Sequence, residues 1–283
     1  MASSAPPASL VDNGEELFDS DELPRDFAHF RGIGQDDSVL SVNFGNFTGA
    51  SAGLEIFLEK NGLVISKYDV ESPHLLRKVC LIFPVPCAVI FTHSKFSRRS
   101  VDVVDGAMRP KVSANSGTGL VESAQIGTLD DQILYGTLET VAKLTPVEGV
   151  CFGAFTYTDD EHEVDIEVLS SCYTTGYGEI VPPGLQFTNQ KLPGSMVKSN
   201  SVAPYGFDPS ADYHTYTIEW AADSTKFYVD DVLKHTFTEN IPTVATQFLW
   251  NAWSSGDPNW TASPPTQDSY TLIKSVHLQY TTA

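Results

Sequence analysis

Basic residues are scarce in this sequence. Lysine and arginine provide 17 of its 283 residues, against 36 aspartates and glutamates, so the formal net charge is −19. A protein that binds nucleic acid or an anionic membrane needs Lys and Arg to neutralise phosphate groups. The deficit argues against nucleic acid, anionic membranes and acidic polysaccharides, and it favours a neutral partner.

The sequence also lacks a long apolar run and a leader segment. Its longest apolar stretch, residues 80–91, is too short to span a bilayer and is interrupted by Pro84 and Pro86. The first nine residues contain neither a basic region nor an apolar stretch, so no signal peptide is visible. We therefore expect no membrane association.

Cysteines are few, and none is spaced as in a zinc site. The four are Cys80, Cys87, Cys151 and Cys172. Cys151 and Cys172 flank an acidic segment and could either pair or simply pack, since sequence does not fix disulfide connectivity. No metal site is predicted.

Short β-like runs recur from about residue 38 onward, separated by Gly, Pro, Asn and Asp. They are Ser38–Phe44, Leu54–Leu58, Val121–Ile126, Ile133–Lys143, Val150–Tyr157, Glu163–Leu169, Tyr213–Trp220, Thr225–Val229, Leu233–Phe237, Gln247–Trp253 and Tyr270–Tyr280. Many short strands without helical periodicity are typical of an all-β sandwich or barrel. Asp230-Asp231, between two such runs, predicts a hairpin turn.

Two segments differ in composition from the rest. Residues 1–25 are rich in Ser, Pro and Ala and then acidic, so we expect a disordered lead before a single domain over residues 26–283. Residues 78–95 are the most apolar part of the chain. They are either a buried strand pair joined by a proline turn or a segment foreign to the fold, such as retained intron sequence.

The most informative segment is Glu163-Val164-Asp165-Ile166-Glu167. In a strand, alternate side chains point to opposite faces, so the three carboxylates share one face and the apolar residues share the other. Like charges side by side repel, and Asp is depleted in strands. Hydrolysis of a glycosidic bond is a reaction that requires paired carboxylates.

This segment and five others, taken in order, resemble glycoside hydrolase family 16. The catalytic motif of that family is Glu-x-Asp-x-Glu on one strand. The other matching segments are Leu134–Glu139, Gly153–Tyr157, Tyr213–Trp220, Lys226–Asp231 and Phe248–Trp253, and Gly256–Trp260 looks like a variant of fungal members. The resemblance covers residues 120–283 well and residues 38–120 weakly.

The resemblance implies a jelly-roll sandwich of two curved antiparallel sheets, the concanavalin A-like lectin and glucanase fold. It implies that Glu163 is the nucleophile, Glu167 the general acid/base and Asp165 the residue between them. Strand spacing separates the Cα atoms of Glu163 and Glu167 by about 13 Å. Retaining enzymes need carboxyl groups about 5–5.5 Å apart, so the resemblance, and not the spacing, selects a retaining mechanism.

Aromatic residues are the candidates for sugar contacts, because flat rings can stack on pyranose C–H groups. The candidates are Trp253, Tyr157, Trp250 and Trp260, each with core packing as the alternative. Regular alternation places Trp250 and Trp253 on opposite faces. His162 could tune the charge of the nucleophile, or could be an ordinary histidine at a loop edge.

The function expected from these observations is that of a retaining endo-β-glucan hydrolase acting on β-1,3/1,4-linked glucan. The motif has no extra residue before its last Glu, and in this it is similar to the motif of lichenases and cell-wall transglycosylases. A transglycosylase acting on glucan, xyloglucan or chitin is therefore the first alternative. A non-catalytic glycan-binding module is the second. The expected partner is a neutral cell-wall polysaccharide, and the protein is expected to be an extracellular or cell-wall monomer that requires no cofactor, with a structural calcium ion left open.

Overall fold

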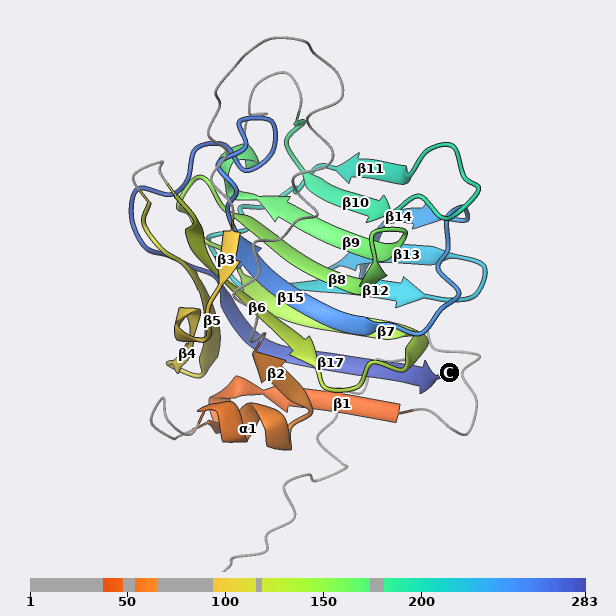
Figure 1. The fold of residues 1–283 in the computed structure, drawn as a ribbon, viewed down its shortest axis with the longest axis horizontal. Helices are drawn as coiled ribbons and strands as arrows, with labels where there is room; N and C mark the ends of the chain where they lie inside the picture. Colours follow the sequence, from red (N-terminus) through yellow and green to blue (C-terminus); the bar gives the residue numbers. More distant parts are fainter. Residues whose placement is uncertain (1–37, 48–53, 66–93, 116–118, 174–180) are drawn as a thin grey trace, which may run out of the picture. The chain divides into compact units, whose positions relative to one another are not determined.

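Two β-sheets packed face to face form the framework of the structure, a computed structural model (Figure 1). The structure describes residues 38–47, 54–65, 94–115, 119–173 and 181–283. Strand pairing in both sheets is antiparallel, apart from a parallel pair between β3 and β6. The expected all-β jelly-roll sandwich is confirmed.

The first sheet has nine strands within the described residues. Along the sheet they are β14 (Val232–Phe237), β13 (Thr225–Val229), β12 (His214–Trp220), β7 (Ile133–Lys143), β17 (Leu272–Thr282), β5 (Ala107–Val112) and β16 (Ser269–Tyr270), with β1 (Ser38–Asn43) beside β17 and β4 (Val101–Val104) beside β5.

The second sheet has eight strands in the same described ranges. Their order is β11 (Ser199–Ala203), β10 (Leu185–Asn189), β9 (His162–Leu169), β8 (Cys151–Asp159), β15 (Gln247–Trp253), β6 (Val121–Thr128) and β2 (Leu63–Ile65), with β3 (Ser94–Phe96) beside β6. Figure 1 shows these strands curving across the front of the molecule. The acidic segment therefore lies in the interior of this sheet, between β8 and β10.

The core lies between the two sheets and is built by alternation along each strand. Val164, Ile166 and Val168 of β9 are almost completely buried. The rings of Phe187 on β10 and Phe227 on β13 stack across the two sheets, with centroids 4.7 Å apart. Each face of β9 thus has a separate task, because the face opposite the carboxylates holds the strand onto the core.

One expected strand is a helix. Residues Leu54–Leu58 begin α1 (Leu54–Lys60), and the expected strand there is wrong. Leu54 and Leu58 are both buried. They lie four residues apart, which is the spacing of one helix face. Short 3-10 helices lie at η1 (Phe44–Asn46), before α1, and at η3 (Arg98–Ser100) and η4 (Ser170–Cys172), after it.

The predicted hairpin turn at Asp230-Asp231 is confirmed. It joins β13 to β14, and its two residues have positive φ angles of 50° and 62°. Two consecutive residues with positive φ form the type I′ turn, whose twist suits a tight hairpin.

The two segments of unusual composition lie mostly outside the described residues. The predicted lead, residues 1–25, lies entirely outside them. Of residues 78–95, the last two belong to β3, where the Ser94 hydroxyl donates a hydrogen bond of 2.7 Å to the Ser254 carbonyl. Both predictions about these segments stay predictions.

Candidate active site

The carboxylates of Glu163, Asp165 and Glu167 lie on the face of β9 that points away from the other sheet. The residues between them, Val164 and Ile166, are buried in the core, as the alternation predicted. Asp165 is 3% exposed, whereas Glu163 and Glu167 are half-buried. The structure therefore brings the three predicted acids together on one face, with the middle one buried.

Strand register sets the neighbours of each acid. On β8, Tyr157 pairs with Glu163, Phe155 with Asp165 and Gly153 with Glu167. On β10, Thr188 pairs with Asp165 and Gln186 with Glu167. Because paired residues have side chains on the same face, the acids are surrounded by aromatic and amide groups that could contact a polar ligand.

The surroundings of Asp165 favour the neutral form of its carboxyl. Burial raises the pKa of its carboxyl well above the usual range, and the charges of Glu163 and Glu167 raise that pKa further. The carboxyl also hydrogen-bonds the side chain of Glu163. A protonated Asp165 can thus donate to Glu163 and orient it.

Gln190, the residue that follows β10, contacts the same acid. Its Nε2 donates a hydrogen bond of 3.3 Å to Oδ2 of Asp165, and its backbone N–H donates to the Glu163 carbonyl at 2.9 Å. With one Asp165 oxygen accepting from Gln190, its carboxyl group is fixed in rotation. The sequence analysis did not identify Gln190 as a site residue.

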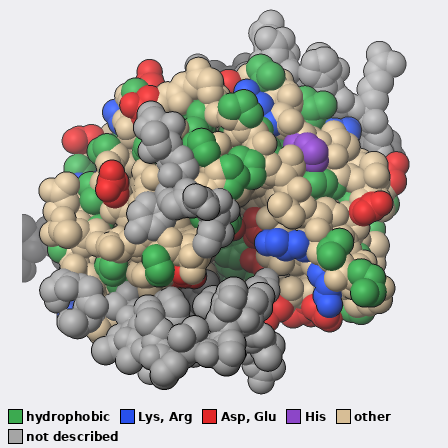
Figure 2. Space-filling view, turned by 90° about the horizontal axis from the view of Figure 1, so that it is seen from above, with side chains coloured by type: hydrophobic (Ala, Val, Ile, Leu, Met, Phe, Trp, Pro, Cys, Tyr) green, Lys and Arg blue, Asp and Glu red, His purple; other side chains and the backbone are tan. Residues whose placement is uncertain are grey.

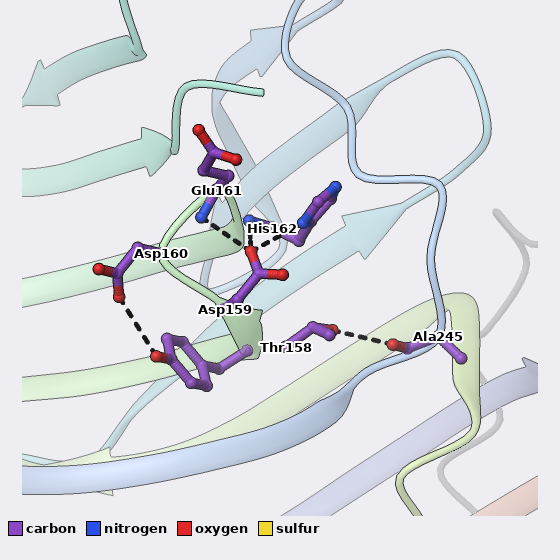
Figure 3. A network of polar contacts seen from close by, with 7 residues as sticks. Thr158, Asp159, Asp160, Glu161, His162 and Ala245 are labelled. Carbon is purple, nitrogen blue, oxygen red and sulfur yellow. Dashed lines mark hydrogen bonds and ion pairs between the residues drawn. The ribbon is translucent and has the colours of Figure 1, made fainter. Parts of the chain in front are cut away.

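The β8–β9 hairpin turns at Asp160 and Glu161, which shortly precede Glu163 in the chain (Figure 3). Tyr157 donates a hydrogen bond of 3.3 Å to Asp160, and its ring lies edge-on to Phe155. Burial raises the pKa of the Tyr157 hydroxyl, as do the charges of Asp160 and Glu163, so it stays protonated. Tyr157 lies beside Glu163, and the sugar contact expected for its ring stays a prediction.

His162 is engaged within the hairpin itself. Its Nδ1 lies 2.8 Å from Oδ1 of Asp159, an oxygen that also accepts the backbone N–H groups of Glu161 and His162 (Figure 3). This contact fits the loop-edge alternative, and the expectation that His162 tunes the nucleophile stays a prediction.

An apolar cluster borders the Glu167 end of the face. It consists of Cys151, Leu169, Cys172, Val181 and Trp253, with Phe96 and Trp260 packed against them. Trp253 is 7% exposed and Trp260 is half-buried. Both predicted tryptophans therefore lie at the end of the acidic face where the general acid/base is expected.

Trp250 is not part of this face. It is completely buried between the sheets, and its Nε1 donates a hydrogen bond of 2.7 Å to Thr140 Oγ1 on β7. The expected sugar contact for Trp250 is corrected to core packing. The predicted division of Trp250 and Trp253 between opposite faces is confirmed.

Asn251 is a polar group that sequence reasoning missed. It is 8% exposed, and its Oδ1 has no hydrogen-bond partner within the described part of the chain. It pairs with Gly153, where a Cβ atom would approach Asn251 Oδ1 to 2.6 Å. Asn251 lies two residues from Trp253 on β15, and this polar residue in an aromatic strand was the signal available in the sequence.

Charge on the surface is uneven. Figure 2 shows acidic side chains spread over the face seen from above, with basic side chains beside a hollow where hydrophobic and acidic groups meet. One basic residue, Lys198, acts on Asp165 and lowers its pKa, against the larger effects that raise it.

Cysteine and metal chemistry are limited in the described residues. Cys151 and Cys172 are both buried, and neither forms a disulfide there. Cys80 and Cys87 lie outside the described ranges. Across the part of the chain that the structure describes, no three His, Cys, Asp or Glu side chains are grouped to hold a metal ion. The expectation of no required cofactor, with calcium left open, stays a prediction.

The fold and the acidic face of β9 place the chain among the β-sandwich glycoside hydrolases. Within that class, the profile of Glycosyl hydrolases family 16 matches residues 93–270, so the chain belongs to this family.

Similar proteins include glucanases from several bacteria. A Beta-glucanase of Paenibacillus polymyxa is 32% identical over 143 residues, which are 46% of this chain and 52% of that protein. A Beta-glucanase of Brevibacillus brevis is 29% identical over 188 residues, 62% of this chain and 68% of the relative. Congo red hypersensitive protein 1 of Saccharomyces cerevisiae is 29% identical over 132 residues, 45% and 24% respectively. The chain spans about half the length of the Paenibacillus relative.

Solved structures share the fold. A beta-glucanase of Bacillus licheniformis superposes with a TM-score of 0.56 at 24% identity, covering 68% of this chain and 87% of that one. A lichenase from a mouse hindgut metagenome gives 0.61 at 16% identity, covering 85% and 98%. A Crh5 transglycosylase in complex with NAG gives 0.50 at 22% identity, covering 64% and 76%. At these identities the likeness concerns the fold.

Proposed function

We propose that this protein is a retaining endo-β-glucan hydrolase that cleaves β-1,3/1,4-linked glucan. The observation that supports this most directly is the buried Asp165 between two half-buried glutamates on one strand face. Membership of the family and the similarity to bacterial beta-glucanases support the substrate class. The neutral glucan also suits an acidic protein that would repel anionic polymers.

In the first half-reaction, Glu163 would attack the anomeric carbon of the glucan. Its carboxylate forms a covalent bond to that carbon while the bond to the glycosidic oxygen breaks. Glu167, protonated, transfers its proton to the departing oxygen. Asp165 would hold Glu163 in position through the hydrogen bond between their side chains.

In the second half-reaction, Glu167 is ionised and acts as a base. It takes a proton from a water molecule, whose oxygen attacks the anomeric carbon and releases Glu163. The stereochemistry of the anomeric carbon is inverted twice and is therefore retained. Asn251, whose unpaired Oδ1 lies near Gly153 and Glu167, is suited to accept a hydrogen bond from a sugar hydroxyl.

A transglycosylase using the same carboxylates is the second candidate. It would differ in the second half-reaction, where a sugar hydroxyl replaces water. The similarity to Congo red hypersensitive protein 1 and the fold shared with a Crh5 transglycosylase support this second candidate. The apolar cluster beside Glu167, with Trp253 and Trp260, offers rings on which an acceptor sugar could stack.

The proposed roles are tested by removing each glutamate. Glu163→Gln and Glu167→Gln should each lower kcat on lichenan or laminarin by roughly 10³-fold or more, measured as release of reducing ends. Trp250→Phe, a change in the core away from the acids, is the control and should keep kcat within about twofold. Near wild-type activity in either glutamine variant would overturn the proposal.

Chemical rescue distinguishes the two roles. With an activated aryl glycoside, Glu163→Ala and azide should give a glycosyl azide of inverted configuration, because azide replaces the nucleophile directly. Glu167→Ala and azide should give retained configuration, because azide attacks the covalent intermediate. NMR of the anomeric proton identifies each product, and exchanged outcomes would reverse the assignment.

Product analysis separates hydrolysis from transfer. Short donor and acceptor glycans should give only shorter products if water is the acceptor, and longer oligosaccharides if transfer dominates. Binding of glycan without turnover would instead favour the non-catalytic module, which has no need of paired carboxylates. We also propose an extracellular or cell-wall location, where such a substrate occurs. Within the described ranges, no helix has the length and apolar character to cross a membrane.

A further inference from the structure

A buried thiol contacts the carboxyl group proposed as the general acid/base. Cys151 Sγ lies 3.4 Å from Oε1 of Glu167, in the geometry of a thiol that donates a hydrogen bond. Cys151 pairs with Leu169, two residues beyond Glu167 on the same face of β9. Gly153, which pairs directly with Glu167, has no side chain to come between the thiol and the carboxyl.

The thiol is closed off from solvent and keeps its proton. Cys151 is completely buried within the apolar cluster. Burial raises the pKa of the Cys151 thiol well above its usual value, and the charge of Glu167 raises it further. The group is therefore S–H throughout the working pH range of an enzyme, and its role is not that of a nucleophile.

The thiol proton has two acceptors within reach. Glu167 Oε1 lies 3.4 Å from the sulfur, and the Phe152 carbonyl oxygen lies 3.7 Å from it. Trp260 packs against the apolar cluster that contains Cys151. The shorter contact directs the thiol at one carboxyl oxygen of Glu167.

We propose that Cys151 is a positioning residue for the acid/base. Its thiol donates a hydrogen bond to Oε1 of Glu167 in both protonation states of that carboxyl, so that the transferable proton is carried on Oε2. This rests on the role proposed above for Glu167. In the first half-reaction, the proton leaves Oε2 for the glycosidic oxygen, while Oε1 keeps its contact with the thiol. In the second, Oε2 takes the proton of water, and the carboxyl need not rotate between the steps.

A weak donor suits this task. A hydroxyl or ammonium group at the same place would stabilise the ionised carboxylate strongly and leave Glu167 a poorer acid. A thiol donates weakly, so it fixes the rotamer at a small cost in acidity. Among the described residues, Glu163 and Lys198 act together with Glu167 on the carboxyl of Asp165, the two glutamates raising its pKa and Lys198 lowering it. On β10, Gln186 is neutral, and its amide donates to the Pro182 and Gly184 carbonyls.

Two substitutions of Cys151 test the proposal through the pH dependence of kcat/KM. Its alkaline limb follows the pKa of the acid, because activity falls when Glu167 loses its proton. Cys151→Val removes the donor, so the ionised form of Glu167 is less stable. The alkaline limb should then move to higher pH by about half a unit, with kcat reduced about tenfold and KM unchanged. Cys151→Ser keeps a donor and should leave the limb at or below its wild-type position.

Controls separate this role from packing. Cys172→Val alters the other described cysteine of the same cluster and should not move the limb. Thermal unfolding of each variant reports lost packing, and Cys151→Ala replaces the valine variant if that chain does not fold. An alkaline limb that stays in place in Cys151→Val and Cys151→Ala, while Glu167→Gln remains inactive, overturns the positioning role alone. An active Glu167→Gln overturns the proposed function itself.

Discussion

Asp165 is the most deeply buried of the three acids, and its protonation couples the site to stability. Its folded-state pKa is raised, first by burial and then by Glu163 and Glu167. A carboxyl whose pKa is raised by folding contributes fully to stability below its unfolded pKa. That contribution is lost as the pH rises through the folded-state value, and each unit of difference is worth about 1.4 kcal/mol.

Replacing Asp165 by Asn should therefore remove the pH-dependent contribution of this carboxyl to the free energy of unfolding. The unfolding free energy of the wild type should fall, relative to Asp165→Asn, as the pH rises from mildly acidic to alkaline. The variant should also lose roughly 10²-fold in kcat, because an amide cannot match the protonated carboxyl as a donor to Glu163. Urea unfolding at several pH values measures the first effect. Parallel curves for the two proteins would show that Asp165 is ionised in the native state.

The acids themselves could be predicted from the sequence, but their partners could not. Alternation along one strand places Glu163, Asp165 and Glu167 on the same face without any knowledge of the fold. The contacts made by Gln190, Cys151 and Asn251 depend on which strands are neighbours and in what register. Those are properties of pairings between distant segments, which the sequence of one strand does not contain.

Strand β15 divides its tryptophans between the core and the acidic face. Trp250 fills space between the sheets and bonds Thr140, whereas Trp253 belongs to the apolar cluster. Sequence alternation predicted the division but could not say which ring faced which way. The helix α1 shows the converse limit, since a five-residue run with buried ends at positions i and i+4 fits either a strand or a helix turn.

Substitution of Trp250 should affect stability far more than chemistry. Trp250→Ala leaves a cavity and an unpaired Thr140 hydroxyl, so the unfolding free energy should fall by about 3–5 kcal/mol. Trp250→Phe keeps most of the volume and should cost about 1–2 kcal/mol. Denaturant midpoints at constant slope measure both changes. A loss of less than about 1 kcal/mol in the alanine variant would contradict the core placement.

At the scale of the whole molecule, independence from a metal ion stays a prediction. The described residues contain no cluster of His, Cys, Asp and Glu suited to one. The proposed chemistry uses two carboxyl groups and water, with no Lewis acid. The acidic composition, with a net charge of −19, favours solubility and repels polyanions, but it does not create a site.

Because the proposed chemistry uses two carboxyl groups and water, kcat should survive the removal of divalent ions. Exhaustive dialysis against EDTA is expected to leave kcat on lichenan unchanged, and a loss of kcat that added calcium restores would contradict this. Differential scanning calorimetry of the dialysed protein, with and without added calcium, tests the structural calcium ion that was left open. A calcium-dependent rise in the midpoint would reveal a site built from backbone carbonyls or from residues beyond those described.

Strand β9 uses its residues on both faces, the core face and the acidic face. Its even positions hold the sandwich together through Val164, Ile166 and Val168, and its odd positions present the acids. Deleting one amino acid within it, or inserting one that the sheet does not absorb as a bulge, would exchange the two sets, sending carboxylates inward and hydrocarbon outward. An added residue at the bend of Asp160 and Glu161 would leave both sets on their own faces.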